Sequence, residues 1–143
     1  MKKIDLKPTH ENIIESIKND TTGRNNYINN FVKMLNTQSD SWSIAIDGKW
    51  GTGKTFFVKQ CKLVIDYLND GQIKNSEKEE ILRTIERGKR GCLNEIEYKT
   101  AYFDAWKNDS ELDPIVALSK SIASVSYNMS STIEKRQGKL GKN

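Results

Sequence analysis

The expected fold is decided by residues 44–55, which read Ile-Ala-Ile-Asp-Gly-Lys-Trp-Gly-Thr-Gly-Lys-Thr. Residues 42–46 form a short, largely apolar run, and Asp47-Gly48 is a typical turn pair, so we expect a strand that ends there. After Lys54 the apolar residues recur with the period of a helix, and Gly71 is well placed to end it. The predicted order is therefore strand, glycine-rich loop and helix.

The loop fits the pattern G-x-x-x-x-G-K-[ST] over residues 48–55 at every fixed position. Its glycines allow the backbone to turn sharply and to approach an anion closely, with successive N–H groups pointing inward. The helix that follows adds unpaired N–H donors and the positive end of its dipole. The sequence thus predicts a site for a nucleoside triphosphate with Mg²⁺. Lys54 would bridge the β- and γ-phosphates and Thr55 would ligate the metal.

The predicted nucleotide contacts are the loop and the first helical residues. Lys49 and Trp50 occupy unspecified positions of the pattern, and we favour the interpretation in which the indole packs beside the loop and the lysine is solvated. No residue is assigned as catalytic, since Lys54 is expected only to stabilise phosphate charge. The set is Gly48, Lys49, Trp50, Gly51, Thr52, Gly53, Lys54, Thr55 and Phe56.

Asp104 is the one acidic residue that we place near this site from the sequence. It follows Tyr102-Phe103 in a run rich in β-formers, residues 97–106, and superficially resembles the carboxylate that holds Mg²⁺ through water in P-loop proteins. Because that run is short and contains Thr100, Asp104 is placed beside the site, in the second sphere of the metal, rather than assigned a catalytic role.

The rest of the chain is predicted to be mostly helical. Apolar residues at spacings of three and four predict helices over residues 11–18 and 24–35. Ser76 opens a capping-box pattern, which predicts a short charged helix within an exposed insertion over residues 69–91. Residues 97–106 are expected to form a second strand, parallel to the first because a helical crossover separates them. Asp113-Pro114 predicts the start of a last helix.

Composition excludes several classes of protein. The chain has 143 residues, of which 36% are hydrophobic and 29% charged, as expected for a soluble domain. Its net charge of +4 is too small and too dispersed to require a nucleic-acid partner, and no apolar run is long enough for a membrane span. Cys61 and Cys92 lack metal-site spacing and are interpreted as reduced thiols. We therefore expect a cytoplasmic protein.

Two strings together carry a family resemblance. The first is the loop with its preceding strand, residues 44–55, and the second is Tyr-Phe-Asp-Ala-Trp-Lys-Asn-Asp at residues 102–109. Over roughly residues 20–130 the sequence resembles the KAP family of P-loop NTPases. Gly23-Arg24 and Tyr27 also lie where members of this family begin the domain.

The resemblance implies an α/β fold, namely a partial P-loop NTPase three-layer fold with a short parallel sheet flanked by helices. It implies ATP as the nucleotide and links the family to membrane-associated signalling or to phage exclusion. The expected organisation is a helical lead-in over residues 1–20, the N-terminal part of the NTPase domain over residues 21–133, and a basic flexible tail over residues 134–143.

One departure from the family pattern limits the expected activity. The family's Walker B strand, an apolar run ending in consecutive acidic residues, has no counterpart after Trp106. We therefore expect an ATP-binding N-terminal part of an NTPase whose complete form hydrolyses ATP, with little hydrolysis by this chain alone. Its partners would be the nucleotide and either a second copy or the missing C-terminal part.

Two alternatives stay open at this point. The chain can be a truncated, non-catalytic interaction or regulatory module, an interpretation that the missing Walker B strand favours. It can also be a small phosphotransferase in which Asp104 serves the acceptor hydroxyl, although Lys89-Arg90 are the only candidates for the basic lid that such an enzyme needs.

Overall fold

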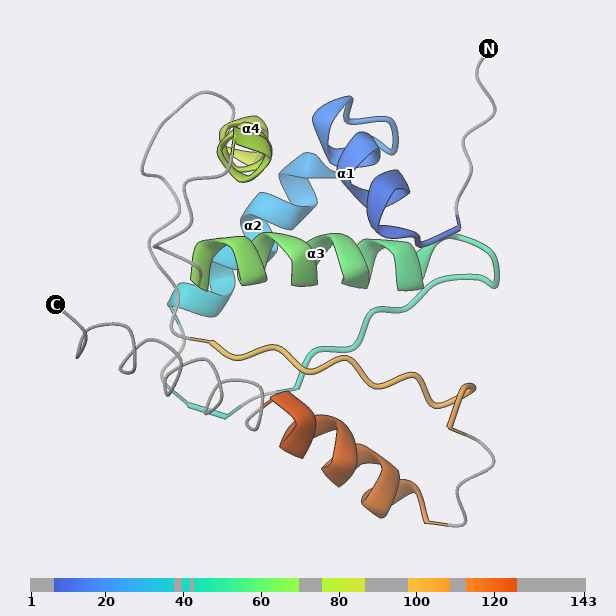
Figure 1. The fold of residues 1–143 in the computed structure, drawn as a ribbon. Coiled ribbons are helices and arrows are strands. Elements are labelled where there is room, and N and C mark those ends of the chain that lie inside the picture. The colour runs from blue at the N-terminus through green and yellow to red at the C-terminus, as the bar shows by residue number, and fades with distance from the viewer. Residues whose placement is uncertain are drawn as a thin grey trace, which may run out of the picture. The chain divides into compact units, whose positions relative to one another are not determined.

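The computed structural model describes residues 7–37, 40–41, 43–69, 76–86, 98–108 and 113–125. They belong to two compact units, Met1–Tyr98 and Lys99–Asn143, and each unit is described by itself. The first unit contains four helices in its described part: α1 (His10–Lys18), α2 (Asn25–Asn36), α3 (Lys54–Asn69) and α4 (Ser76–Ile85) (Figure 1). The described part of the second unit contains one helix, over residues 114–125.

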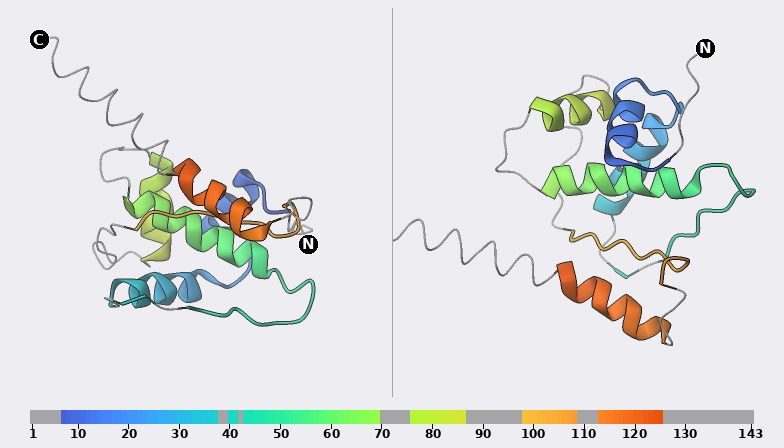
Figure 2. Two further views of the ribbon diagram at one scale, coloured as in Figure 1. Left: turned by 90° about the horizontal axis from the view of Figure 1, so that it is seen from below. Right: turned by 45° about the vertical axis from the view of Figure 1, so that its right-hand side comes forward.

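Helix α3 is the element around which the first unit packs. The other three helices all contact it, and α4 also contacts α1 and α2. Helices α1 and α4 lie on the same side of α3, while α2 crosses behind it (Figures 1 and 2). The buried cluster takes apolar side chains from all four helices: Ile13, Ile14, Ile17, Ile28, Val32, Phe56, Cys61, Val64, Ile65, Leu68, Ile81 and Ile85.

The position of α4 corrects one expectation. We expected residues 69–91 to form an exposed insertion, but Ile81 and Ile85 are fully buried against the other helices. They are four residues apart, so one narrow apolar stripe faces the core, while Glu79 and Arg83 are exposed. Lys18 of α1 adds an ion pair to Glu80 of α4 at 2.6 Å. Helix α4 is therefore an integral part of the core.

Buried amide side chains of α2 fix the relative positions of the helices. Asn25 donates from Nδ2 to the carbonyl oxygen of Ile17 at 2.7 Å, and Asn29 donates from Nδ2 to the carbonyl oxygen of Ile85 at 2.7 Å. Both acceptors lie in the last turn of a helix, where carbonyl groups lack partners within the helix. One face of α2 thus satisfies the ends of both α1 and α4, which sets its register against them.

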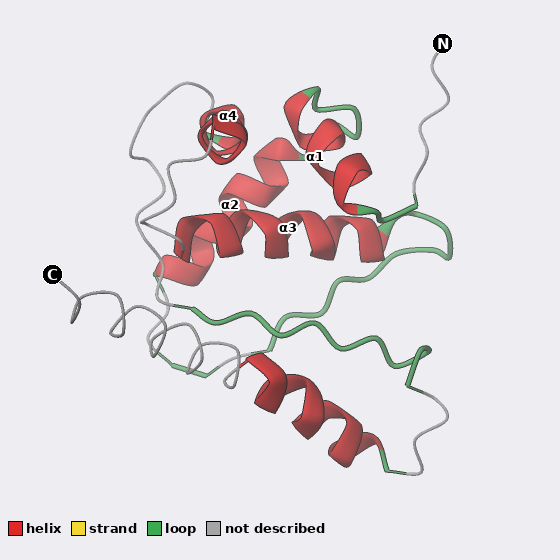
Figure 3. Cartoon of the chain, in the orientation of Figure 1, coloured by secondary structure: helices red, strands yellow, loops and turns green. Residues whose placement is uncertain are grey.

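The expected parallel sheet is wrong for the part of the chain that the structure describes. Helices and loops make up these residues, and no strand is drawn among them (Figure 3). Residues 42–46 were expected to form a strand, yet Ile44 and Ile46 are 42% and 38% exposed. A strand requires hydrogen bonds to a neighbouring strand, and an apolar pattern alone cannot supply that partner. Trp42 and Glu97, the first residues of the two predicted strands, lie outside the described residues.

The second unit confirms the predicted start of the last helix. Asp113 accepts a hydrogen bond at Oδ1 from the backbone N–H of Ile115 at 2.8 Å, and Pro114 is the first helical residue. Proline suits this position because its missing N–H would have no partner within the helix. The predicted basic tail from residue 134 lies outside the described residues. Among the described helices of both units, none is both long and apolar enough to cross a bilayer.

Candidate functional site

The glycine-rich loop, residues 48–53, joins the extended residues 43–47 to the first residue of α3. Gly51 and Gly53 both have a φ of +79°, a conformation that residues with a Cβ rarely adopt. Thr52 closes a turn inside the loop, since its Oγ1 and its backbone N–H both donate to the carbonyl oxygen of Lys49, at 2.9 and 3.3 Å. The loop therefore has a defined, tightly turned backbone.

Lys54 brings a positive charge back over this loop. Its Nζ donates to the carbonyl oxygen of Gly48 at 2.6 Å and to that of Lys49 at 3.0 Å. The same residue begins α3, whose first backbone N–H groups have no partners within the helix. An ammonium group and the positive end of a helix dipole thus meet at one place. This combination attracts anions.

Arg24 contacts the loop from outside the motif. The residue precedes α2, and its guanidinium donates from Nη1 to the carbonyl oxygen of Gly53 at 3.1 Å and from Nη2 to that of Thr52 at 2.7 Å. The packing is close, because a Cβ placed on Gly53 would lie 3.2 Å from Arg24 Nη1. Two neighbouring loop carbonyls are therefore held by one planar fork.

A pocket of about 250 Å³ opens beside the loop. Arg24 and Lys54 contribute positive charge to it, while the carboxylate of Asp47 accepts from the backbone N–H of Gly48 at 2.7 Å. Tyr27 adds an exposed aromatic ring. Two cationic side chains and one carboxylate therefore line this pocket. Its lining residues are Arg24, Tyr27, Ile46, Asp47, Thr52, Lys54 and Phe57.

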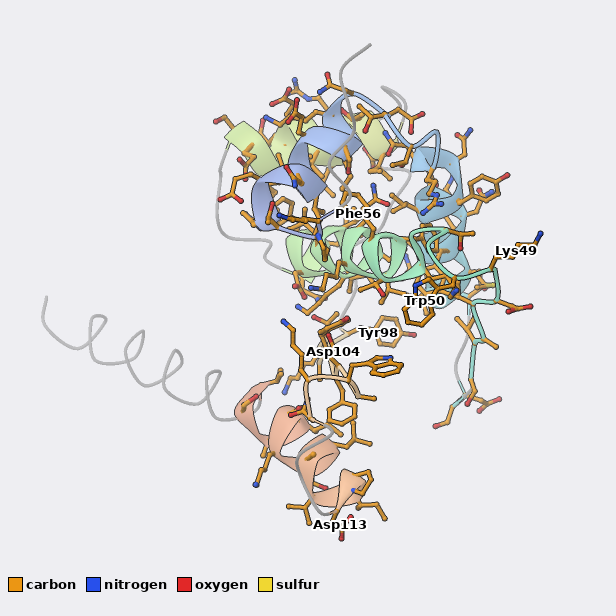
Figure 4. All side chains as sticks on the ribbon, turned by 90° about the vertical axis from the view of Figure 1, so that its right-hand side faces the viewer. Lys49, Trp50, Phe56, Tyr98, Asp104 and Asp113 are labelled. Carbon is orange, nitrogen blue, oxygen red and sulfur yellow. The ribbon has the colours of Figure 1, made fainter. Side chains whose placement is uncertain are left out.

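The predicted contact residues occupy different environments. Thr55 is exposed in the first turn of α3. The side chain of Phe56 is buried in the core, which leaves only its main chain for the site (Figure 4). Lys49 is exposed and extends outward, as expected. Trp50 is 89% exposed, so its indole adds little buried surface to the loop, contrary to the packing that we expected.

Asp104 lies in the second unit, and its proposed place beside the loop stays a prediction. Its carbonyl oxygen accepts from the backbone N–H and from Nδ2 of Asn108, at 3.2 and 2.7 Å, which closes a turn after the extended residues. Burial, together with the negative charge of Asp104, raises the pKa of Tyr102. Within the described residues, no group of three or more His, Cys, Asp or Glu side chains is arranged to hold a metal ion.

The pocket-lining residues that we did not assign to the site from the sequence are Arg24, Tyr27, Ile46, Asp47 and Phe57. Arg24 binds main-chain carbonyls, and a main-chain partner leaves no signature in the sequence. The signal available was the resemblance itself, which placed Gly23-Arg24 and Tyr27 at the start of the domain. Their distance from the motif along the chain hid the spatial connection.

Comparison with known proteins gives one match. Searches of curated proteins and of solved structures found no match to this chain. Residues 24–141, which are most of the chain and begin at Arg24, match the KAP family P-loop domain. This is a family of P-loop NTPase domains, for which nucleotide binding is the expected property. The chain belongs to the KAP family of P-loop domains.

Proposed function

We propose that residues 48–55 bind the phosphate chain of a nucleoside triphosphate, ATP, together with Mg²⁺. The observation that carries the proposal is the position of the Lys54 ammonium, 2.6 and 3.0 Å from the carbonyl oxygens of Gly48 and Lys49, at the N-terminus of α3. Family membership supports nucleotide binding in general. The choice of adenine rests on the family resemblance alone.

The roles follow from the chemistry of the residues. Lys54 exchanges its contacts with loop carbonyls for contacts with the β- and γ-phosphates, and the backbone N–H groups at the start of α3 bind further phosphate oxygens. The exposed Thr55 hydroxyl supplies one ligand to Mg²⁺, and phosphate oxygens and water supply the others. A magnesium ion held in this way needs no cluster of protein carboxylates.

The test is calorimetric titration of the chain with a non-hydrolysable ATP analogue and Mg²⁺. We expect the parent to bind and Lys54→Ala to lose at least about tenfold in affinity, because a charge-assisted hydrogen bond contributes about 1.5–3 kcal/mol. Lys33→Ala is the matched control, since it removes the same charge from the exposed last turn of α2. Circular dichroism checks that each variant is folded.

A second arm addresses the metal. Removal of Mg²⁺ with a chelator should weaken binding by the parent and have little further effect on Thr55→Ala, because that variant has already lost its ligand to the ion. A folded Lys54→Ala variant that binds as tightly as the parent would refute the assignment of the loop. A folded parent that does not bind the nucleotide would refute the function.

A further inference from the structure

Arg24 lies 28 and 29 residues before the two loop residues whose carbonyls it binds. It also lines the pocket beside Lys54. No part of the G-x-x-x-x-G-K-[ST] pattern requires an arginine at this place. Its role therefore has to be derived from the geometry of the loop.

The planarity of the peptide bond connects Arg24 to the predicted phosphate contacts. In a trans peptide the carbonyl of one residue and the N–H of the next point in opposite directions. Fixing the carbonyl of Thr52 therefore fixes the direction of the Gly53 N–H. Fixing the carbonyl of Gly53, which also accepts the N–H of Phe57 at 3.0 Å, fixes that of the Lys54 N–H. Both N–H groups are turned away from the guanidinium. They belong to the stretch of loop that is proposed to bind phosphate.

The backbone of Arg24 is itself firmly held. Its carbonyl oxygen accepts the N–H of Ile28 at 3.0 Å, and Ile28 is fully buried. The next residue, Asn25, donates from its backbone N–H to Asp20 Oδ1 at 3.1 Å and from Nδ2 to the carbonyl oxygen of Ile17 at 2.7 Å. The guanidinium thus extends from a packed helix start rather than from a loose loop.

From this geometry we infer that Arg24 is a positioning residue, which orients the N–H groups of Gly53 and Lys54 toward the phosphates by holding two adjacent carbonyls from behind. The inference rests on the proposed function. A lysine would keep the charge but cannot present two parallel donors in a fixed plane. The site therefore requires the planar guanidinium with its two parallel donors, and not the positive charge alone. Gly53 fits this arrangement, since its missing Cβ leaves room for the guanidinium.

The test uses tripolyphosphate with Mg²⁺ as the probe, because it presents the phosphate chain without a base. Arg24→Ala and Arg24→Lys should both weaken its binding by about tenfold, equivalent to about 1.4 kcal/mol. Arg83→Ala is the control, since it removes an arginine whose 3.5 Å ion pair with Glu79 is exposed. In the ligand-free protein, the amide NMR shifts of Gly53 and Lys54 should change most in both Arg24 variants.

The outcomes separate this inference from the proposed function. Parent-like affinity in a folded Arg24→Ala variant, or full restoration by Arg24→Lys, would overturn the positioning role. If the parent binds neither tripolyphosphate nor MgATP, the proposed function fails. The amide shifts then decide whether Arg24 orients the two peptide groups. Unchanged shifts at both residues would overturn the inference independently of any ligand.

Discussion

Substitution of the two loop glycines by alanine offers a sharp test of the contact between Arg24 and the loop. Gly51 and Gly53 have the same φ of +79°, a value at which a Cβ strains the backbone at either position. Their surroundings differ. A Cβ on Gly51 meets no atom within 4 Å, whereas one on Gly53 lies 3.2 Å from Arg24 Nη1. The pair therefore separates backbone strain from displacement of the guanidinium.

The expected magnitudes follow from these distances. The left-handed conformation costs a residue with a Cβ roughly 1–2 kcal/mol, and this is the full expected effect of Gly51→Ala. Gly53→Ala carries the same cost. It also moves the flexible end of Arg24 by a few tenths of an ångström, which weakens the hydrogen bond to the Gly53 carbonyl. Because the guanidinium is only partly buried, we expect about 1 kcal/mol of additional destabilisation rather than the full value of a charged hydrogen bond.

The assay is urea unfolding in the absence of nucleotide, followed by far-ultraviolet circular dichroism, which reports on the helices of the chain. Both substitutions are repeated in an Arg24→Ala background, which forms a double-mutant cycle. There the extra cost at Gly53 should vanish, while the strain at both positions remains. Equal destabilisation by the two alanines in the parent would show that Arg24 does not pack on Gly53. If the additional destabilisation by Gly53→Ala persisted without Arg24, it would arise from the position of Gly53 next to α3 instead.

Three further predictions concern the core. Ile81→Ala should lower the free energy of unfolding by about 2–5 kcal/mol, because Ile81 is fully buried between helices. Arg83→Ala, at an exposed position, should change it by less than about 0.5 kcal/mol. Equally small effects of both substitutions in urea titrations would show that α4 is peripheral. Burial raises the pKa of the Cys61 thiol to about 12, so in a Cys92→Ser background alkylation at neutral pH should be slow when the protein is native and fast in urea. Because the pKa of the thiol is raised in the folded state, the contribution of Cys61 to stability is fully present below its ordinary pKa of 9.0 and is lost as the pH rises toward about 12. A Cys61→Ser variant should not lose stability in this way over that pH range.

The helices could be predicted from the sequence because the information for them is local. Residues three and four apart fall on one face of a helix, so Ile13, Ile14 and Ile17 define the buried stripe of α1 without reference to any other part of the chain. The start of the last helix at Asp113-Pro114 is local in the same sense, since the capping carboxylate and the N–H that it accepts are two residues apart.

The errors have a common origin in non-local interactions. The apolar pattern of residues 44–46 shows that they can pair with a strand, but not that a strand is present to pair with. The many charged residues of Ser76–Ile85 favoured an exposed helix. Averaged over the helix, they outweigh Ile81 and Ile85, which are four residues apart and form its buried stripe. Whether such a narrow stripe is buried depends on the partners available, here α1, α2 and α3.

The glycine-rich loop has a turned backbone although the strand that we expected before it is not formed in the part of the chain that the structure describes. Among the described residues, the loop is shaped by its own hydrogen bonds from Thr52 and Lys54 and by the guanidinium of Arg24, and α3 is anchored in a helical core through Phe56. From the motif we could expect only the sharply turned backbone and the start of the helix near Lys54. The contact with Arg24 joins segments far apart in the sequence, and for that reason it needed the structure. If Arg24 orients the loop amides, nucleotide affinity should depend on the packing of α2 as well as on the motif.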